Sequence, residues 1–307
     1  MATVPSSRLG ADALGAAIPE GLMDPAAMYE FDVNGVIVFR NVLDAGAVQR
    51  MNTAIDGDGL AGTESPAQSN GGFGFPVPWA ADPVFLETMA GEAVLSVARV
   101  MCGDWLRLDH AYGIQMNDRW DGKANLHGGA RTDQGEHQYQ WHQNRMYNGL
   151  IVVMFALHPV REGDGGFICV PGSHRANVPF RPPVDHSMVI NPTLEPGDML
   201  VFTEALVHGT TYWTNERVRR SILFKYIPGY STWGDPAFAD AIRPLVPKGN
   251  DTALALLQPP GVGGRSPVPG LPGTGAYGDA NYQVSQLALA RGDAGKAPAS
   301  TRQVARM

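Results

Sequence analysis

The stretch at residues 139–230 constrains the fold more than any other part of the chain. Short apolar runs, such as those at residues 150–157 and 199–202, alternate with turns rich in glycine and proline. Such spacing is typical of an antiparallel β-sandwich or jelly roll. Strands do not alternate with long helices here, which disfavours a doubly wound α/β fold.

Several short motifs follow one another within this stretch. Residues 139–144 read Tyr-Gln-Trp-His-Gln-Asn, and a Pro-Gly-Ser-His turn stands at residues 171–174. His142 and His208 lie 66 positions apart, each at the end of an expected strand, and Arg219 follows His208 by eleven positions. The order and spacing of these motifs indicate one site assembled from several strands.

These motifs resemble those of the phytanoyl-CoA dioxygenase family of Fe(II)/2-oxoglutarate oxygenases, over residues 31–230. The resemblance implies a mainly β fold, a double-stranded β-helix (jelly roll, cupin-like) core with flanking α-helices. It also implies Fe(II) and 2-oxoglutarate as cofactors. In that family a His-x-Asp pair opens the core, whereas this chain has Asn144 in place of the Asp.

The resemblance makes His142, Asn144 and His208 the expected metal ligands. Non-haem Fe(II) sites use two histidines and one carboxylate, with positions left open for cofactor and O₂. An amide oxygen is neutral, so Asn144 could ligate, another carboxylate could complete the set, or the position could stay open to water or an anion. Glu204, four residues before His208, is expected at the catalytic site, more as a partner of a ligating histidine than as a ligand. His127 could supply a third nitrogen.

Arg219 and Ser221 are the expected cofactor-binding residues. A guanidinium binds a carboxylate through two parallel hydrogen bonds, which suits the distal carboxylate of 2-oxoglutarate. Residues two apart on a strand face the same side, so both side chains can reach one anion. Arg220 should then face the other way.

The expected function is a non-haem Fe(II)/2-oxoglutarate-dependent dioxygenase that uses O₂ to hydroxylate, or otherwise oxidise, a small organic molecule. Two alternatives remain: a 2-oxoglutarate-dependent halogenase or oxygenase with an altered ligand set, and a catalytically silent jelly-roll binding protein. A net charge of −7 disfavours nucleic-acid and anionic-membrane surfaces. The expected location is cytoplasmic, with no membrane partner, because the sequence has no long apolar run. The sequence predicts no oligomeric state.

The domain organisation predicted is a flexible arm at residues 1–22, a single jelly-roll oxygenase domain at 23–258 and a mobile Pro/Gly-rich tail at 259–307. Within the domain, the apolar periodicity predicts the following helices, strands and loops. Helices are expected at 23–29, 44–55, 83–101 and 240–257, strands at 31–40 and 106–116, and loops at 56–78 and 118–138.

Overall fold

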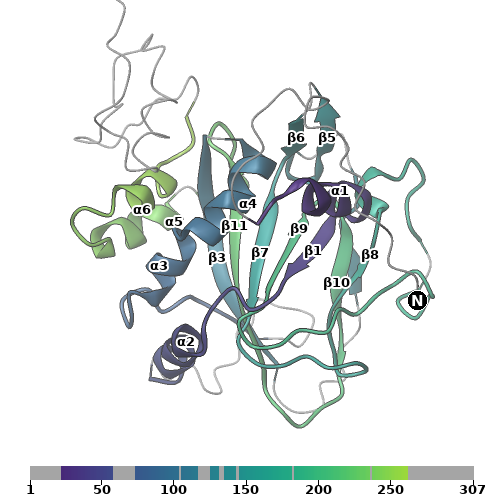
Figure 1. Ribbon diagram of the computed structural model, residues 1–307, viewed down its shortest axis with the longest axis horizontal. Helices are drawn as coiled ribbons and strands as arrows, with labels where there is room; N and C mark the ends of the chain where they lie inside the picture. Colours follow the sequence, from purple (N-terminus) through teal and green to yellow (C-terminus); the bar gives the residue numbers. More distant parts are fainter. Residues whose placement is uncertain are drawn as a thin grey trace, which may run out of the picture.

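The structure, a computed structural model, describes residues 22–57, 73–103, 105–116, 125–130, 135–142, 145–181, 183–235 and 237–261 (Figure 1). Its larger sheet has the strand order β1-β9-β7-β11-β3-β2, with antiparallel pairing throughout. These strands are β1 (Val36–Phe39), β2 (Phe73–Phe75), β3 (Leu106–Met116), β7 (Ile151–Ala156), β9 (Met199–Thr203) and β11 (Arg219–Pro228).

A smaller sheet faces the larger one and has the order β4-β10-β8. Its strands are β4 (Asn125–His127), β8 (Gly165–Val170) and β10 (Val207–Trp213). A separate hairpin consists of β5 (Tyr139–His142) and β6 (Arg145–Asn148). Two facing antiparallel sheets confirm the predicted jelly-roll class.

Six α-helices accompany the sheets: α1 (Pro25–Asn34), α2 (Ala45–Gly57), α3 (Val84–Met89), α4 (Glu92–Cys102), α5 (Phe238–Ile242) and α6 (Asp251–Leu256) among the described residues. Single 3₁₀ turns occur at Gly135–His137, Ser173–Arg175 and Arg243–Leu245. In Figure 1, α3 and α4 lie beside β3 and β11, while β8 and β10 lie on the other side of the larger sheet. No described helix combines the length and the apolar character needed to cross a membrane.

The larger sheet is buried on both faces. Val153 and Phe155 of β7 pack with the helices in one core, whereas Val152 and Met154 pack in a second core towards the smaller sheet. The smaller sheet contributes Phe167, Cys169 and Trp213 to the second core. Because both faces of β7 are covered, the apolar run at residues 150–157 shows no polar alternation.

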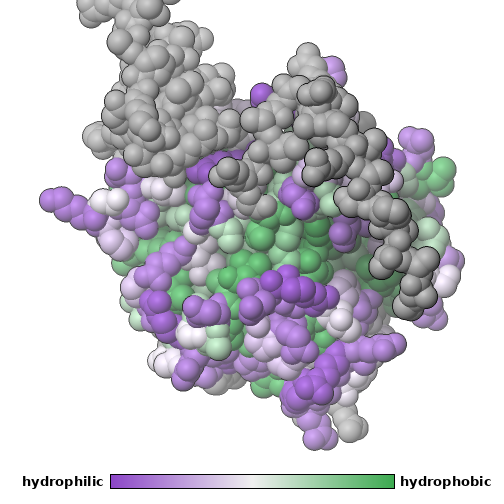
Figure 2. Space-filling model, viewed as in Figure 1, coloured by the Kyte–Doolittle hydropathy of each residue, from purple (hydrophilic) through white to green (hydrophobic). Residues whose placement is uncertain are grey.

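The helical side of the larger sheet carries a surface groove. Figure 2 shows hydrophobic side chains gathered in the middle of the visible face, with hydrophilic ones around them. Val42, Val84, Val94 and Phe155 line a groove between α2, α3 and α4. This groove lies outside the space between the two sheets, where the candidate site described below is found.

Several predicted element boundaries are wrong for identifiable reasons. The strand predicted from residue 31 begins only at Val36, because α1 continues to Asn34 and buries Phe31 completely. The helix predicted at 83–101 is two helices, interrupted at Gly91, a residue with low helix propensity. The loops predicted at 56–78 and 118–138 contain β2 and β4, which are strands only because longer neighbours pair with them.

Other predicted elements agree with the structure. Strand β3 occupies residues 106–116 as predicted, and Asp44 caps α2 by accepting a hydrogen bond from the Ala47 amide at 2.7 Å. Helices α5 and α6 lie at the C-terminal end of the described chain. The predicted arm lies outside the described residues apart from Leu22, as does the predicted tail apart from residues 259–261.

The Pro-Gly-Ser-His turn connects the two sheets to α1. Ser173 Oγ donates to the Val170 carbonyl at 2.6 Å and accepts from the Val207 amide at 2.7 Å, which fixes the start of β10. His174 is fully buried, and its Nε2 lies 3.1 Å from the Asp32 carbonyl of α1. The turn is therefore structural, and it positions the residue that follows Val207, namely His208.

Gly35 is required where α1 meets this turn. Its φ is +73°, and an added Cβ would lie 2.5 Å from Nδ1 of the buried His174 ring. Gly35→Ala is expected to lower the free energy of unfolding by about 1–3 kcal/mol. The alanine would be strained in the left-handed backbone conformation, and its Cβ would overlap the His174 ring. Urea denaturation measures this change. Gly57→Ala is the matched control: Gly57 has no heavy atom near its added Cβ, so its effect should stay within about 0.5 kcal/mol. Equal effects of the two substitutions would contradict this account.

Candidate metal and cofactor site

Two histidines meet on neighbouring strands of the smaller sheet. His208 of β10 is the direct cross-strand partner of His127 in β4, and the two ring centroids are 4.3 Å apart. Glu204 lies in the turn between β9 and β10, four residues before His208. The ligand atoms of these three residues all lie within 4.8 Å of one another, and within the described ranges they form the one group of three or more such side chains.

The orientation of His208 leaves one ring nitrogen free for a ligand. Its Nδ1 lies 2.8 Å from the Leu206 carbonyl, which requires the proton to be on Nδ1. Nε2 then presents a lone pair, and it lies 3.7 Å from Oε1 of Glu204. A lone pair and a carboxylate oxygen repel each other at this separation unless a cation lies between them. Two imidazoles and one carboxylate are also the donor set that non-haem Fe(II) favours, so these residues fit the metal that the sequence predicted.

Buried charges surround this group. Lys225 Nζ lies 3.2 Å from Oε2 of Glu204, and both side chains are almost fully buried. Burial alone would raise the pKa of Glu204, but the charges of Lys225 and His208 outweigh it and lower that pKa to about 2. Burial lowers the pKa of His208 to about 4, so the imidazole is neutral at physiological pH, as a metal ligand must be.

The other residues predicted to bind metal lie elsewhere or are not described. His142 is exposed at the end of β5 and does not belong to the group of His127, Glu204 and His208. Asn144 lies outside the described residues. The family resemblance made His142 the expected first ligand, and His127 was only a possible third nitrogen donor within an expected loop. The Gly-Gly pair after His127 was the available signal: Gly128 has φ +87°, and an added Cβ would lie 2.4 Å from the Leu206 carbonyl oxygen.

Arg219 is an unusual buried arginine. It faces the interior at the start of β11, where its Nη atoms lie 3.5 Å from Sδ of Met116 and 3.8 Å from Sδ of Met154. No carboxylate among the described residues pairs with it, and its Nε has no hydrogen-bond partner there. Burial lowers the pKa of Arg219 to about 10. An unpaired buried charge is costly, so this guanidinium is suited to an anion that the chain itself does not supply.

The neighbours of Arg219 support an anion site. Ser221 lies two residues further along β11, and its buried Oγ likewise has no partner among the described groups. Gly166 of β8 leaves the necessary space, because an added Cβ would lie 2.6 Å from Nε of Arg219. Arg220 faces the opposite side of the sheet, where it bonds to Asn52 and Asp56 of α2 at 2.9 and 2.8 Å.

The sequence profile of the phytanoyl-CoA dioxygenase family (PhyH) matches residues 31–221 of the chain. The chain belongs to this family. None of the curated proteins matches its sequence. The family match covers every strand of both sheets up to the first three residues of β11, and so includes Arg219 and Ser221.

Solved structures of similar fold include HygX and SnoN. HygX from Streptomyces hygroscopicus with nickel and 2-oxoglutarate bound is 24% identical, with a TM-score of 0.59 over 69% of this chain and 89% of HygX. HygX with hygromycin B also bound gives a TM-score of 0.60 at 24% identity, over 68% and 89% of the two chains. SnoN, an α-ketoglutarate-dependent epimerase from nogalamycin biosynthesis, is 17% identical, with a TM-score of 0.52 over 69% and 87%. At these identities the similarity establishes the fold that the family shares.

Proposed function

We propose that the protein is a mononuclear Fe(II)/2-oxoglutarate-dependent oxygenase that acts on a small organic molecule. The observation that carries this proposal is the His127–Glu204–His208 group in the interior of a jelly roll of the phytanoyl-CoA dioxygenase family. The unpaired Arg219 on the neighbouring sheet supports it independently. HygX and SnoN, which share the fold, are 2-oxoglutarate-binding or α-ketoglutarate-dependent proteins.

The side chains have distinct roles in this proposal. His127, Glu204 and His208 would hold the iron, and Arg219 with Ser221 would bind the distal carboxylate of 2-oxoglutarate. When bound, iron and 2-oxoglutarate supply the oxidising chemistry with O₂. The chain supplies neutral imidazoles, one carboxylate and the buried guanidinium of Arg219, whose attraction to a carboxylate is strong because it is shielded from water.

Glu204 could supply the carboxylate that Asn144 lacks. A carboxylate already lies within reach of both histidines, so a ligand set with one negative charge does not depend on residue 144. This supports the oxygenase over a silent binding protein, because two imidazoles and a carboxylate gathered at one point are a donor set for a metal. The sequence-based set of His142, Asn144 and His208 remains the competing assignment.

Anaerobic reconstitution with Fe(II) tests this function. Adding 2-oxoglutarate and then O₂ should produce succinate at a rate that depends on both the metal and 2-oxoglutarate, even without the natural substrate. Chelated protein is the control and should form none. A protein that binds Fe(II) and 2-oxoglutarate but releases no succinate under any condition would favour the binding-protein alternative.

A further inference from the structure

Lys225 and His110 face each other across two strands beside the metal group. They are direct cross-strand partners in the pairing of β11 with β3. Lys225 belongs to the interior face of β11, on the same side as Arg219, Ser221 and Leu223, because side chains alternate along the strand. His110 therefore lies at the same end of the interior as Lys225.

The ammonium group of Lys225 has hydrogen-bonding capacity left over. It carries three N–H donors. Oε2 of Glu204 accepts one at 3.2 Å, and Tyr112 is its other hydrogen-bond partner. Among the residues that the structure describes, no acceptor remains for the third. A lysine ammonium is a cation at neutral pH.

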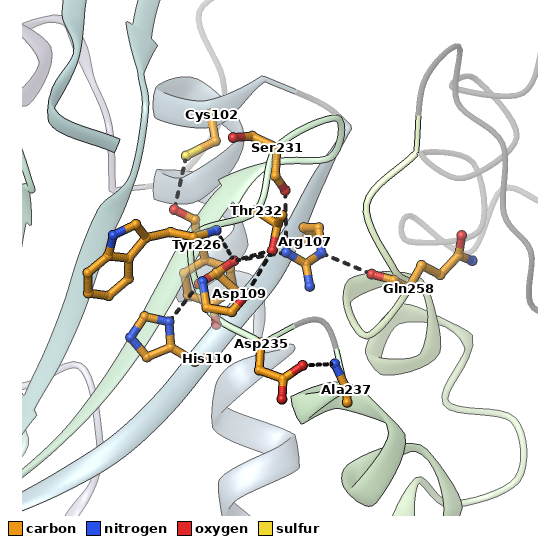
Figure 3. A network of polar contacts seen from close by, with 12 residues as sticks. Cys102, Arg107, Asp109, His110, Tyr226, Ser231, Thr232, Asp235, Ala237 and Gln258 are labelled. Carbon is orange, nitrogen blue, oxygen red and sulfur yellow. Dashed lines mark hydrogen bonds and ion pairs between the residues drawn. The ribbon is translucent and has the colours of Figure 1, made fainter. Parts of the chain in front are cut away.

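His110 is held by a buried carboxylate. Its Nδ1 lies 2.7 Å from Oδ2 of Asp109, whose side chain is completely buried. Figure 3 shows Asp109 between His110 and Arg107, which donates to Oδ1 at 2.9 Å. Burial alone would raise the pKa of Asp109, but bonds from His110 and from the amides of Trp233 and Gly234 lower it well below its usual range. With Nδ1 tied to a charged carboxylate, Nε2 is the nitrogen that His110 presents to a ligand.

Trp233 completes the arrangement. Its backbone is fixed, because its amide donates to Asp109 at 3.1 Å and the Gly234 amide donates at 2.8 Å. The indole nevertheless remains 49% exposed. Its ring centroid lies 5.0 Å from Nζ of Lys225 and 5.2 Å from the His110 ring, which in turn stacks on Tyr112 at 5.9 Å and 11°. An exposed indole with a fixed backbone, beside a cation, offers a planar surface on which the ring of a ligand can stack.

We propose that Lys225, His110, Tyr112 and Trp233 form a substrate subsite for an acidic oxygen carried on a planar ring. The ring would stack on Trp233, and the oxygen would face the free N–H of Lys225 and Nε2 of His110. This proposal rests on the proposed function, since it assigns the substrate class of the same site. Carboxylates and phenols share this chemistry.

A phenol makes the proton balance explicit. Its O–H proton moves to Nε2 of His110, and no other bond changes. The resulting imidazolium lies between Asp109 and the phenolate oxygen, to which Lys225 also donates, and the transfer leaves the net charge of the subsite unchanged. A carboxylate is already ionised when it binds, so it gives no proton to His110. A neutral ether of the same shape can do neither, so it should bind much more weakly.

The test uses 4-nitrophenol, whose phenolate is yellow, with 4-nitroanisole as the neutral isostere and benzoate as the carboxylate arm. The protein is loaded with Ni(II) and 2-oxoglutarate, and uptake of both is measured on the same sample. Wild type should bind 4-nitrophenol as the phenolate and bind benzoate, each at least about tenfold more tightly than 4-nitroanisole. Binding of only one of the two acids would assign the subsite to that class of ligand, phenols or carboxylates. Equal affinity for the neutral ether would overturn the proposal.

Three variants localise the binding. Lys225→Met should weaken both acids about tenfold or more, whereas Lys248→Met, on the exposed surface, should not. Because Lys225→Met leaves Glu204 without its partner, His110→Gln and Trp233→Leu repeat the test away from Glu204. His110→Gln should weaken binding of 4-nitrophenol more than binding of benzoate, because only the phenol gives up a proton to His110, and Trp233→Leu should weaken both acids. Unchanged binding in all three variants contradicts the subsite. Failure of wild type to take up metal or 2-oxoglutarate instead contradicts the proposed function.

Discussion

Replacing Arg219 by Met should abolish 2-oxoglutarate binding without destabilising the ligand-free protein. In the ligand-free chain the guanidinium has sulfur neighbours and no carboxylate partner, so its burial is a cost to folding. A methionine between Met116 and Met154 removes that cost. Binding of a dianion without the guanidinium should be at least about 100-fold weaker, roughly 3 kcal/mol, the scale expected for a buried charge pair.

Thermal unfolding of the Ni(II)-loaded protein, with and without 2-oxoglutarate, measures both the stability of each variant and its stabilisation by the ligand. At a ligand concentration of about 100 times Kd, wild type should gain about 2.7 kcal/mol from 2-oxoglutarate. Arg219→Met should gain no more than about 0.4 kcal/mol at the same concentration, yet unfold at or above the wild-type temperature without ligand. Arg217→Met is the matched control, because Arg217 is partly exposed and already pairs with Asp164 at 2.6 Å. A variant at position 219 that either binds 2-oxoglutarate normally or unfolds on purification is incompatible with the role given to Arg219.

Replacing His127 by Ala should remove most of the metal affinity, whereas His142→Ala should leave it intact. His127 is the direct strand partner of His208, and its loss leaves only two of three ligands. The affinity for Ni(II) should fall by more than the roughly 100-fold that loss of a supporting residue produces. Both histidines are exposed, so neither substitution should change the free energy of unfolding by more than about 0.5 kcal/mol. Calorimetric titration with Ni(II) gives the comparison, and the reverse order of affinities would assign the metal to His142.

The jelly roll itself could be predicted because its signals are local. Apolar runs at residues 150–157 and 199–202 are continuous since both faces of β7 and β9 are covered, and Gly-rich turns separate them. Arg219 and Ser221 could be placed on one face from strand alternation alone. The contact of the Pro-Gly-Ser-His turn with α1 could not be predicted, because it joins residues 142 positions apart.

The place of His127 beside His208 could not be predicted from sequence because β4 has no signal of its own. It is a three-residue strand that exists only through pairing with β10, and its alternation is too short to detect. The same holds for the partners of Glu204. Lys225 is 21 residues away in sequence, and only the register of β11 brings it to the carboxylate. The site is therefore specified by the register of strand pairing, and hydrophobic periodicity within one segment does not predict that register.

The most direct test of the central claim is to locate the metal by anomalous scattering in crystals of the Ni(II)-loaded protein. The account predicts one peak per chain, bonded to Nε2 of His208, to a ring nitrogen of His127 and to a carboxylate oxygen of Glu204, at metal–ligand distances of about 2 Å. A peak coordinated by His142 with His208, and by neither His127 nor Glu204, would contradict it.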